Sequence, residues 1–171
     1  RIFFNNTMAS GVIPQISVIM GPCAGGAVYS PALMDFVFMV KNIGQMFITG
    51  PQVIQAVTGE VVTAEKLGGA ITHNSISGVA HFADEDEASC IKRIRGLLSY
   101  LPSNNTENPP IVQTGDDVNR IDPSLNEVIP ESANKPYDMK LIIHSLADNG
   151  EFFEYQPLYA GNMVTGYIRM G

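Results

Sequence analysis

Short apolar runs separated by glycine and proline mark the first hundred residues of this chain. Residues 36–40 are apolar throughout, which is typical of a strand buried on both faces, and residues 16–20 are nearly so. Residues 45–49 have the pattern of another short strand. Between the first two runs, residues 27–34 favour a helix that Pro31 kinks or ends. Strands that alternate with helices predict an α/β fold.

Four further segments have helical patterns. Residues 2–8 look like the end of a helix, and Thr63 can cap a short helix that stops at a pair of glycines. The clearest pattern covers residues 85–101, and another covers 137–148. In the clearest one, apolar residues recur at steps of three and four and predict one buried face: Ala88, Ile91, Ile94, Leu97, Leu98 and Leu101.

The composition changes abruptly after residue 101. Residues 102–136 are polar and rich in turn-forming residues, which predicts an extended connection laid over the surface. We therefore divide the chain into residues 1–101, part of an N-terminal α/β domain, a linker over 102–136, and residues 137–171, the start of a second domain.

The charge balance excludes several classes of partner. The net charge is −7 and the isoelectric point is about 4.8, whereas nucleic acids and anionic membranes attract clustered Lys and Arg. No apolar run reaches the ~18 residues of a membrane span. The two cysteines, Cys23 and Cys90, have no metal-ligand spacing, so we expect no metal site. These features predict a cytoplasmic protein.

The most informative local motif is the glycine-rich turn at residues 21–29, between a predicted strand and a predicted helix. Consecutive glycines leave backbone amides open to a ligand, either a phosphate or the oxyanion of an enolate. A P-loop requires a lysine where Ala27 stands, and Cys23 occupies the second glycine position of the dinucleotide fingerprint. Two interpretations of the turn therefore remain: a binding site for an oxyanion, and a plain connection between a strand and a helix.

Longer stretches carry a family resemblance in their order and spacing. From Ala9 onward, the chain resembles the carboxyltransferase subunit of biotin-dependent acyl-CoA carboxylases of the propionyl-CoA carboxylase β type. It resembles equally the α subunit of methylmalonyl-CoA decarboxylase. The matching segments are 10–17, 21–32, 35–41, 46–51, 57–60, 67–70, 72–73, 77–81 and 150–154.

The resemblance implies two crotonase-like domains, each a layered spiral of βα units. This chain would hold the C-terminal half of the first domain and the start of the second. Gly25 and Gly26 match the backbone N–H pair of the first domain's oxyanion hole, which stabilises the enolate of a short acyl-CoA such as propionyl-CoA. The implied reaction moves a carboxyl group between carboxybiotin and the α-carbon of this CoA thioester.

The implied partners are a biotin carboxyl carrier and a biotin carboxylase, or the membrane subunits of a Na⁺-pumping decarboxylase, in a homo-oligomer of full-length subunits. In the family, the active site combines the first domain of one subunit with the second domain of another. We therefore expect this fragment alone to be an inactive half-site. A non-catalytic assembly subunit with the same fold is a further alternative.

Other residues are weaker candidates for contact with acyl-CoA. Ala24 and Ala27 flank the glycine pair, while Phe152, Phe153, Tyr159 and Arg169 could reach CoA from the second domain, with packing as the alternative for the aromatic residues. The three histidines, His73, His81 and His144, lack a carboxylate or serine partner at a recognisable spacing, so we expect structural roles. The chain departs from the family at Gly161, where a basic residue is usual, and at Asn74 and Ser75, which often are Thr-Thr.

Overall fold

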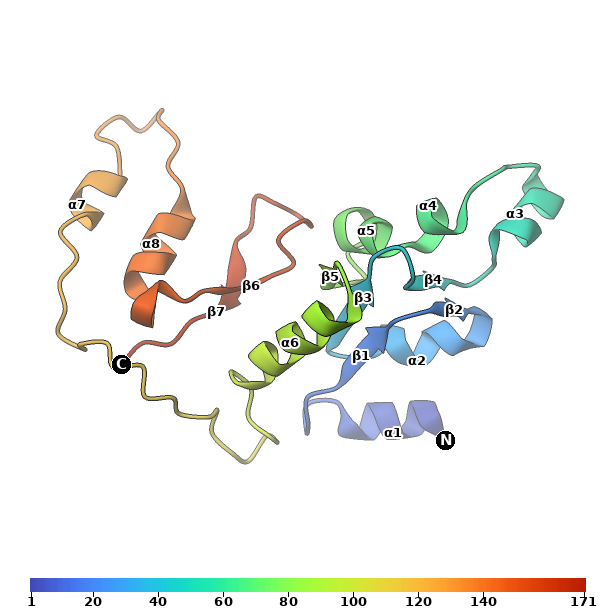
Figure 1. Ribbon diagram of the computed structural model, residues 1–171, viewed down its shortest axis with the longest axis horizontal. Coiled ribbons are helices and arrows are strands. Elements are labelled where there is room, and N and C mark those ends of the chain that lie inside the picture. The colour runs from blue at the N-terminus through green and yellow to red at the C-terminus, as the bar shows by residue number, and fades with distance from the viewer. The chain divides into compact units, whose positions relative to one another are not determined.

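The computed structural model describes residues 1–171, which form two compact units. The first unit comprises residues 1–110 and 158–160, and the second comprises residues 111–157 and 161–171. Each unit contains its own strands and helices (Figure 1). The division of the chain into domains at residues 101 and 136 remains a prediction.

The first unit is built from parallel strands arranged in two small sheets. One sheet has the order β1-β3-β5 and the other has the order β2-β4. Ile16 lies opposite Phe36 in the first sheet, and Pro22 lies opposite Gln45 in the second. Successive βα turns of the chain therefore stack on one another, and the corresponding strands of neighbouring turns pair, as in a spiral. The strands are β1 (Ile16–Ile19), β2 (Pro22–Ala24), β3 (Phe36–Val40), β4 (Gln45–Phe47) and β5 (Phe82–Asp84).

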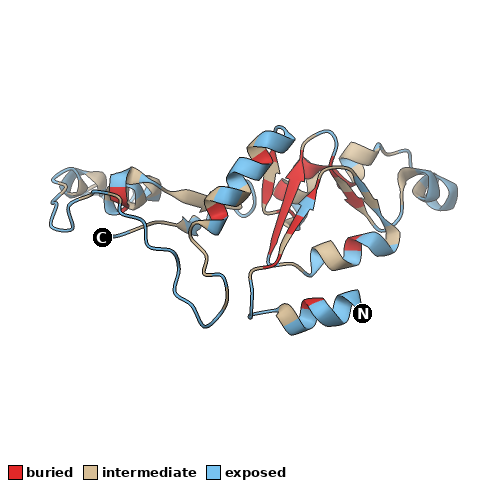
Figure 2. Cartoon of the chain, turned by 60° about the horizontal axis from the view of Figure 1, so that its bottom comes forward, coloured by how far each residue is buried: buried red, intermediate tan, exposed pale blue.

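The core is centred on β3, whose five residues are all buried. Many of the buried positions of the first unit lie in the sheet strands (Figure 2). Phe38 stacks on Phe82 of β5 with ring centroids 4.4 Å apart, and Met39 is fully buried. Full burial of side chains of this size stabilises the fold by about 1.5–3 kcal/mol each. The prediction of a strand buried on both faces is confirmed.

Helices connect and cover these strands (Figure 1). Thr63 caps α4 as predicted, with its hydroxyl accepting a hydrogen bond from the Lys66 amide at 3.2 Å. The helical segments of this unit are α1 (Ile2–Ala9), the 3₁₀ helix Gly25–Val28, α2 (Tyr29–Ala32), α3 (Pro51–Thr58), α4 (Ala64–Gly68), α5 (Ala70–Thr72), the π-helix His73–Ser77 and α6 (Glu87–Leu98).

The longest helix, α6, is shorter than the predicted 85–101 at both ends. Asp86 is its N-cap, and Asp86 and Ser89 form a reciprocal capping box, which fixes the start. Arg93 on this helix forms an ion pair, in which its Nε lies 2.6 Å from Oδ1 of the buried Asp84. The helix is thus joined to the end of β5 by an ion pair.

Several elements of the first unit were not predicted, among them strand β2, helices α3 and α5, the π-helix His73–Ser77 and strand β5. Helix α3 has proline in its first turn and ends at Gly59 in the left-handed conformation, yet none of its residues is buried. It extends away from the β1-β3-β5 sheet (Figure 1). Strand β5 has only three residues and pairs with the end of β3. Helix α3 and strand β5 both lack the sustained periodicity by which longer elements are found.

The second unit combines two helices with an antiparallel strand pair. Helix α8 begins after Asp138, whose carboxylate accepts a hydrogen bond from the Lys140 amide, and it lies within the predicted segment 137–148. The buried Asp148 accepts hydrogen bonds from the Thr114 hydroxyl and the Gly171 amide. The elements are α7 (Leu125–Val128), α8 (Met139–Leu146), the 3₁₀ turn Asp148–Gly150, β6 (Phe153–Tyr155) and β7 (Thr165–Tyr167).

None of the helices in either unit has both the length and the apolar character needed to cross a bilayer.

Candidate active site at the glycine turn

The glycine turn lies where β2 passes into the 3₁₀ helix Gly25–Val28. Ala24 is extended, with φ of −129° and ψ of 155°, and Gly25 then reverses the backbone with φ of +62°. A residue with a side chain is strained at this φ, so glycine is required for the sharp entry into the helix. The sequence motif therefore has a direct conformational cause.

The amides of Gly25 and Gly26 are the unpaired donors at the start of this helix. Neither donates to another group of the chain, and no side chain caps the helix. At the C-terminal end of the helix, the Tyr29 amide donates a hydrogen bond to the Gly26 carbonyl oxygen. Gly26 is exposed, and a Cβ added to it would meet no atom within 4 Å. The two adjacent N–H groups are thus free to bind an oxyanion.

An apolar cavity of about 260 Å³ lies beside the turn. Val28 and Tyr29 continue the helix from the glycine pair into the cavity wall. Met46 and Phe47 of β4 also line the cavity, and they pair with Cys23 and Ala24 of β2. The complete lining is Val28, Tyr29, Ala32, Met46, Phe47, Ile48, His73 and Val79.

His73 is the one histidine in the cavity wall, and both of its ring nitrogens have partners. Nε2 lies 2.7 Å from the Met46 carbonyl oxygen, and Nδ1 lies 2.8 Å from the Ser77 hydroxyl. A carbonyl can only accept, so Nε2 carries a hydrogen. Nδ1 of the neutral ring then accepts from Ser77. This residue has no free nitrogen with which to take a proton from a substrate.

The other histidines also contact the protein itself. The Val37 amide donates to Nδ1 of His81 at 2.8 Å, and burial lowers the pKa of that imidazole. Nδ1 of His144 lies 2.8 Å from the Gly150 carbonyl oxygen. The predicted structural roles of the histidines agree with these contacts. Burial raises the pKa of the Cys23 thiol, so this residue beside the turn is a packed thiol and not an activated nucleophile.

The remaining predicted contact residues are distributed over both units. Phe152 packs edge-on against His144, with centroids 6.0 Å apart, and Phe153 faces Tyr167 across the β6–β7 pair. Tyr159 lies in the first unit, where its ring approaches Gly78. These are packing contacts within each unit. The Arg169 carbonyl accepts from the Asp148 amide at 2.9 Å in the second unit. Contact of these four predicted residues, Phe152, Phe153, Tyr159 and Arg169, with CoA remains a prediction.

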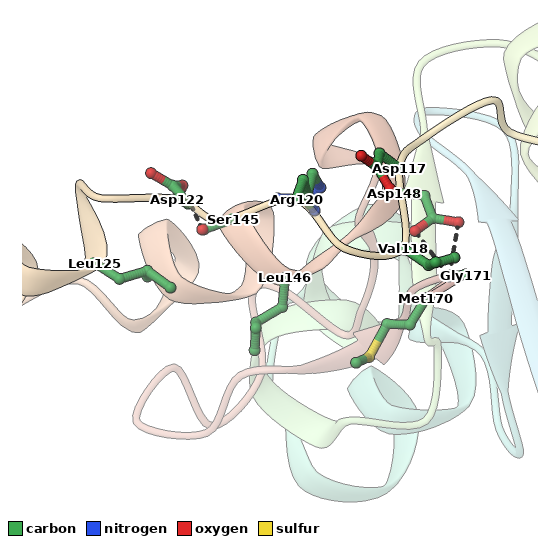
Figure 3. Close-up of a pocket in the computed structure, with 10 residues that line it drawn as sticks. All are labelled: Asp117, Val118, Arg120, Asp122, Leu125, Ser145, Leu146, Asp148, Met170 and Gly171. Atoms are coloured by element: carbon green, nitrogen blue, oxygen red, sulfur yellow. Dashed lines mark hydrogen bonds between the residues drawn. The ribbon is translucent and has the colours of Figure 1, made fainter.

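The second unit has a pocket of its own, of about 300 Å³ (Figure 3). It contains none of the predicted site residues. Its polar groups are engaged with one another, since Ser145 bonds to Asp122 and the Gly171 amide bonds to Asp148. The Arg120 guanidinium donates to the Ala147 carbonyl oxygen at 2.9 Å. No group of three or more His, Cys, Asp or Glu side chains in the molecule is placed to hold a metal ion.

Comparison with known proteins identifies the family. The model of the carboxyl transferase domain matches residues 1–171, so the chain belongs to the carboxyl transferase family. It is 66% identical over 169 residues to the methylmalonyl-CoA decarboxylase α subunit of Veillonella parvula and 54% identical over 170 residues to the propionyl-CoA carboxylase β chain of Roseobacter denitrificans. These matches cover 99% of this chain and 33% of each relative. The chain therefore spans about a third of their length.

The fold agrees with this assignment. Transcarboxylase 12S, solved as a hexamer with hydrolysed methylmalonyl-coenzyme A bound, superposes with a TM-score of 0.94 at 48% identity, covering 98% of this chain and 33% of that one. The geranyl-CoA carboxylase β subunit of Pseudomonas aeruginosa matches less closely, with a TM-score of 0.53 at 30% identity, over 98% of this chain and 31% of that one. The predicted crotonase-like α/β fold is confirmed.

Proposed function

We propose that this chain contributes the acyl-CoA half of a biotin-dependent carboxyltransferase site. In this proposal, the amides of Gly25 and Gly26 donate hydrogen bonds to the thioester oxygen as the α-carbon loses a proton or a carboxyl group. The substrate is propionyl-CoA, methylmalonyl-CoA or a similar short acyl-CoA. The observation that carries the proposal is the pair of adjacent, unpaired and accessible amides at the end of β2.

The surroundings of the turn support an enolate and not a phosphate. The neighbouring cavity is apolar and holds no lysine or arginine to neutralise a phosphate dianion. An enolate carries a single delocalised negative charge next to an apolar acyl group. Two amide donors in a site of low polarity suit that charge, and they are arranged before the reaction begins.

Biotin, on a carrier protein or domain, supplies or accepts the carboxyl group when it is bound. The resemblance assigns the biotin carbonyl to a second oxyanion hole in the other domain, so we assign no residue of this chain to biotin. Biotin carrier and carboxylase partners, and assembly with further copies, belong to the same proposal. Transcarboxylase 12S, the similar solved protein, is a hexamer.

A second candidate is the decarboxylase direction, from methylmalonyl-CoA to biotin. The 66% identity to a methylmalonyl-CoA decarboxylase α subunit favours it, against 54% for the carboxylase β chain. The same two amides serve both directions because the enolate is common to them. The chemistry at the turn therefore does not depend on the direction.

Carboxyl transfer by the full-length subunit tests the proposal. The subunit is mixed either with methylmalonyl-CoA that carries ¹⁴C in its carboxyl group and a free biotin carrier, or with propionyl-CoA and a biotin carrier that carries a ¹⁴C-labelled carboxyl group. The label on each species is then followed. We expect transfer between the thioester and biotin. A full-length subunit that binds neither CoA thioester and transfers no label would contradict the proposal and favour a purely structural subunit.

A further inference from the structure

The π-helix His73–Ser77 adjoins the apolar cavity beside the glycine turn. Such a helix is rare and is frequently found at functional sites. It starts with His73, whose ring lines the cavity, and it ends at Gly78 with φ of +71°. Val79, just beyond, also lines the cavity. One short irregular segment therefore forms part of the cavity wall.

His73 joins this segment to strand β4. Its Nε2 donates to the Met46 carbonyl at 2.7 Å, across 27 residues of sequence. Within the segment, Nδ1 meets the Ser77 hydroxyl, and the Ala80 amide donates to the His73 carbonyl at 3.1 Å. The Val79 amide in turn donates to the Ser77 hydroxyl at 3.3 Å. Two of these contacts are made by the imidazole itself, and the other two hold the same loop through the His73 carbonyl and the Ser77 hydroxyl.

Strand β4 in turn adjoins the glycine turn. Met46 is buried and lies opposite Cys23, two residues before Gly25. The Ile48 carbonyl oxygen is the nearest atom, at 3.9 Å, to a Cβ built on Gly25. A movement of β4 would therefore change both the cavity wall and the support of the turn. The ring of His73 is the side-chain link that holds the π-helix to this strand.

We propose that His73 is a positioning residue for the acyl thioester. It holds the cavity wall through its two ring nitrogens, so that the thioester oxygen meets the amides of Gly25 and Gly26. This inference rests on the function proposed above. Because neither nitrogen is free, His73 transfers no proton. Its contribution is geometric, and misplacement of a reacting group by about 1 Å costs on the order of 10²-fold in rate.

The test uses the full-length subunit and two substitutions of the same residue. His73→Leu removes both hydrogen bonds and is expected to lower kcat by about 10–100-fold, with a smaller change in KM for the CoA thioester. His73→Gln keeps one donor and one acceptor on its amide and is expected to recover most of kcat. The pH profile of kcat in His73→Gln should keep its shape, since no proton-transfer group has been removed.

A second pair of variants covers the case in which His73→Leu does not fold, which thermal unfolding would reveal. Ser77→Ala removes the hydroxyl that bonds to Nδ1 and that also accepts from the Val79 amide, while it leaves the Nε2 bond to Met46 in place. It is expected to lower kcat by roughly 3–10-fold, the effect of weakened hydrogen bonds. Ser75→Ala is the matched control in the same helix. Its hydroxyl bonds only to the Ile71 carbonyl, at 2.8 Å, and we expect native kcat.

The outcomes separate this inference from the function on which it rests. Native kcat in both His73→Leu and Ser77→Ala, with an active wild-type subunit, would overturn the positioning role alone. Loss of one limb of the pH profile in His73→Gln would also overturn it, because His73 would then be an acid or base. A wild-type subunit that neither binds nor turns over acyl-CoA would overturn the proposed function, and the positioning role with it.

Discussion

Replacing Gly26 with proline is the most informative perturbation of the proposed oxyanion hole. Proline has no amide hydrogen, so the variant removes one of the two donors. The residue lies in a 3₁₀ helix, whose φ suits the fixed ring of proline, and its N–H makes no bond within the chain. The fold should therefore tolerate the change.

The matched control is Gly26→Ala, which keeps the amide. Its added Cβ would meet no atom within 4 Å, and Gly26 is not in the left-handed region. Removing one oxyanion donor commonly costs about 10²–10³ in kcat, or roughly 2.7–4 kcal/mol of transition-state stabilisation. We expect that loss in Gly26→Pro and less than about a tenfold change in kcat for Gly26→Ala, where crowding by the methyl would act mainly on KM.

The assay is carboxyl transfer by the full-length subunit with purified biotin carrier. Acyl-CoA affinity, measured by calorimetry, separates weaker binding from a slower chemical step, and circular dichroism with thermal melting checks folding. The reasoning would be refuted if Gly26→Pro folded and retained the kcat of Gly26→Ala. That result would mean that the Gly26 amide does not contact the developing negative charge.

Four further predictions concern activity and stability. Residues 1–171 alone should transfer no carboxyl group under conditions where the full-length subunit does, and turnover at the full-length rate would contradict the half-site. Nδ1 of His81 accepts from the Val37 amide, and burial lowers the pKa of this imidazole. The stability that the neutral ring contributes should therefore be fully present above pH ~6.5 and be lost as the pH falls below it, as measured by urea unfolding. His81→Gln should flatten this dependence of stability on pH, and an unchanged dependence would exclude His81 as its cause. Burial, with Asp84 nearby, raises the pKa of the Cys90 thiol to about 12. Mass spectrometry should therefore find Cys90 unalkylated by iodoacetamide at pH 8 until the protein unfolds. Rapid labelling of Cys90 in the folded protein would contradict this prediction. Gly68→Ala places a Cβ 2.0 Å from the Met46 carbonyl oxygen and should lower the free energy of unfolding by about 1–3 kcal/mol. A Cβ added at Gly21 would meet no atom within 4 Å, so Gly21→Ala should cost far less in the same denaturation experiment.

Local signals predicted the features that depend on neighbours in sequence. The glycine turn was visible because positive φ at Gly25 demands glycine, and β3 was visible because burial on both faces gives an unbroken apolar run. The cap at Thr63 was recognisable because a capping residue and its helix are adjacent in sequence. The family resemblance then supplied the chemical meaning of the turn.

Features that depend on distant pairs were not visible. His73 and Met46 are 27 residues apart, and a hydrogen bond to a backbone carbonyl places no demand on the identity of the accepting residue. Tyr159 approaches Gly78 from 81 positions away, and nothing around either residue signals the contact. Helix α3 was missed because it is short and none of its residues is buried, although a proline at its start and Gly59 at its end mark its bounds.

The central claim is that two adjacent amides receive the oxygen of a CoA thioester. A crystal or cryo-electron microscopy structure of the full-length subunit with a non-reactive propionyl-CoA analogue would test it most directly. The account predicts the carbonyl oxygen of the analogue at about 2.7–3.1 Å from the nitrogens of Gly25 and Gly26. A bound analogue whose carbonyl oxygen lies out of hydrogen-bonding reach of both nitrogens would contradict the account.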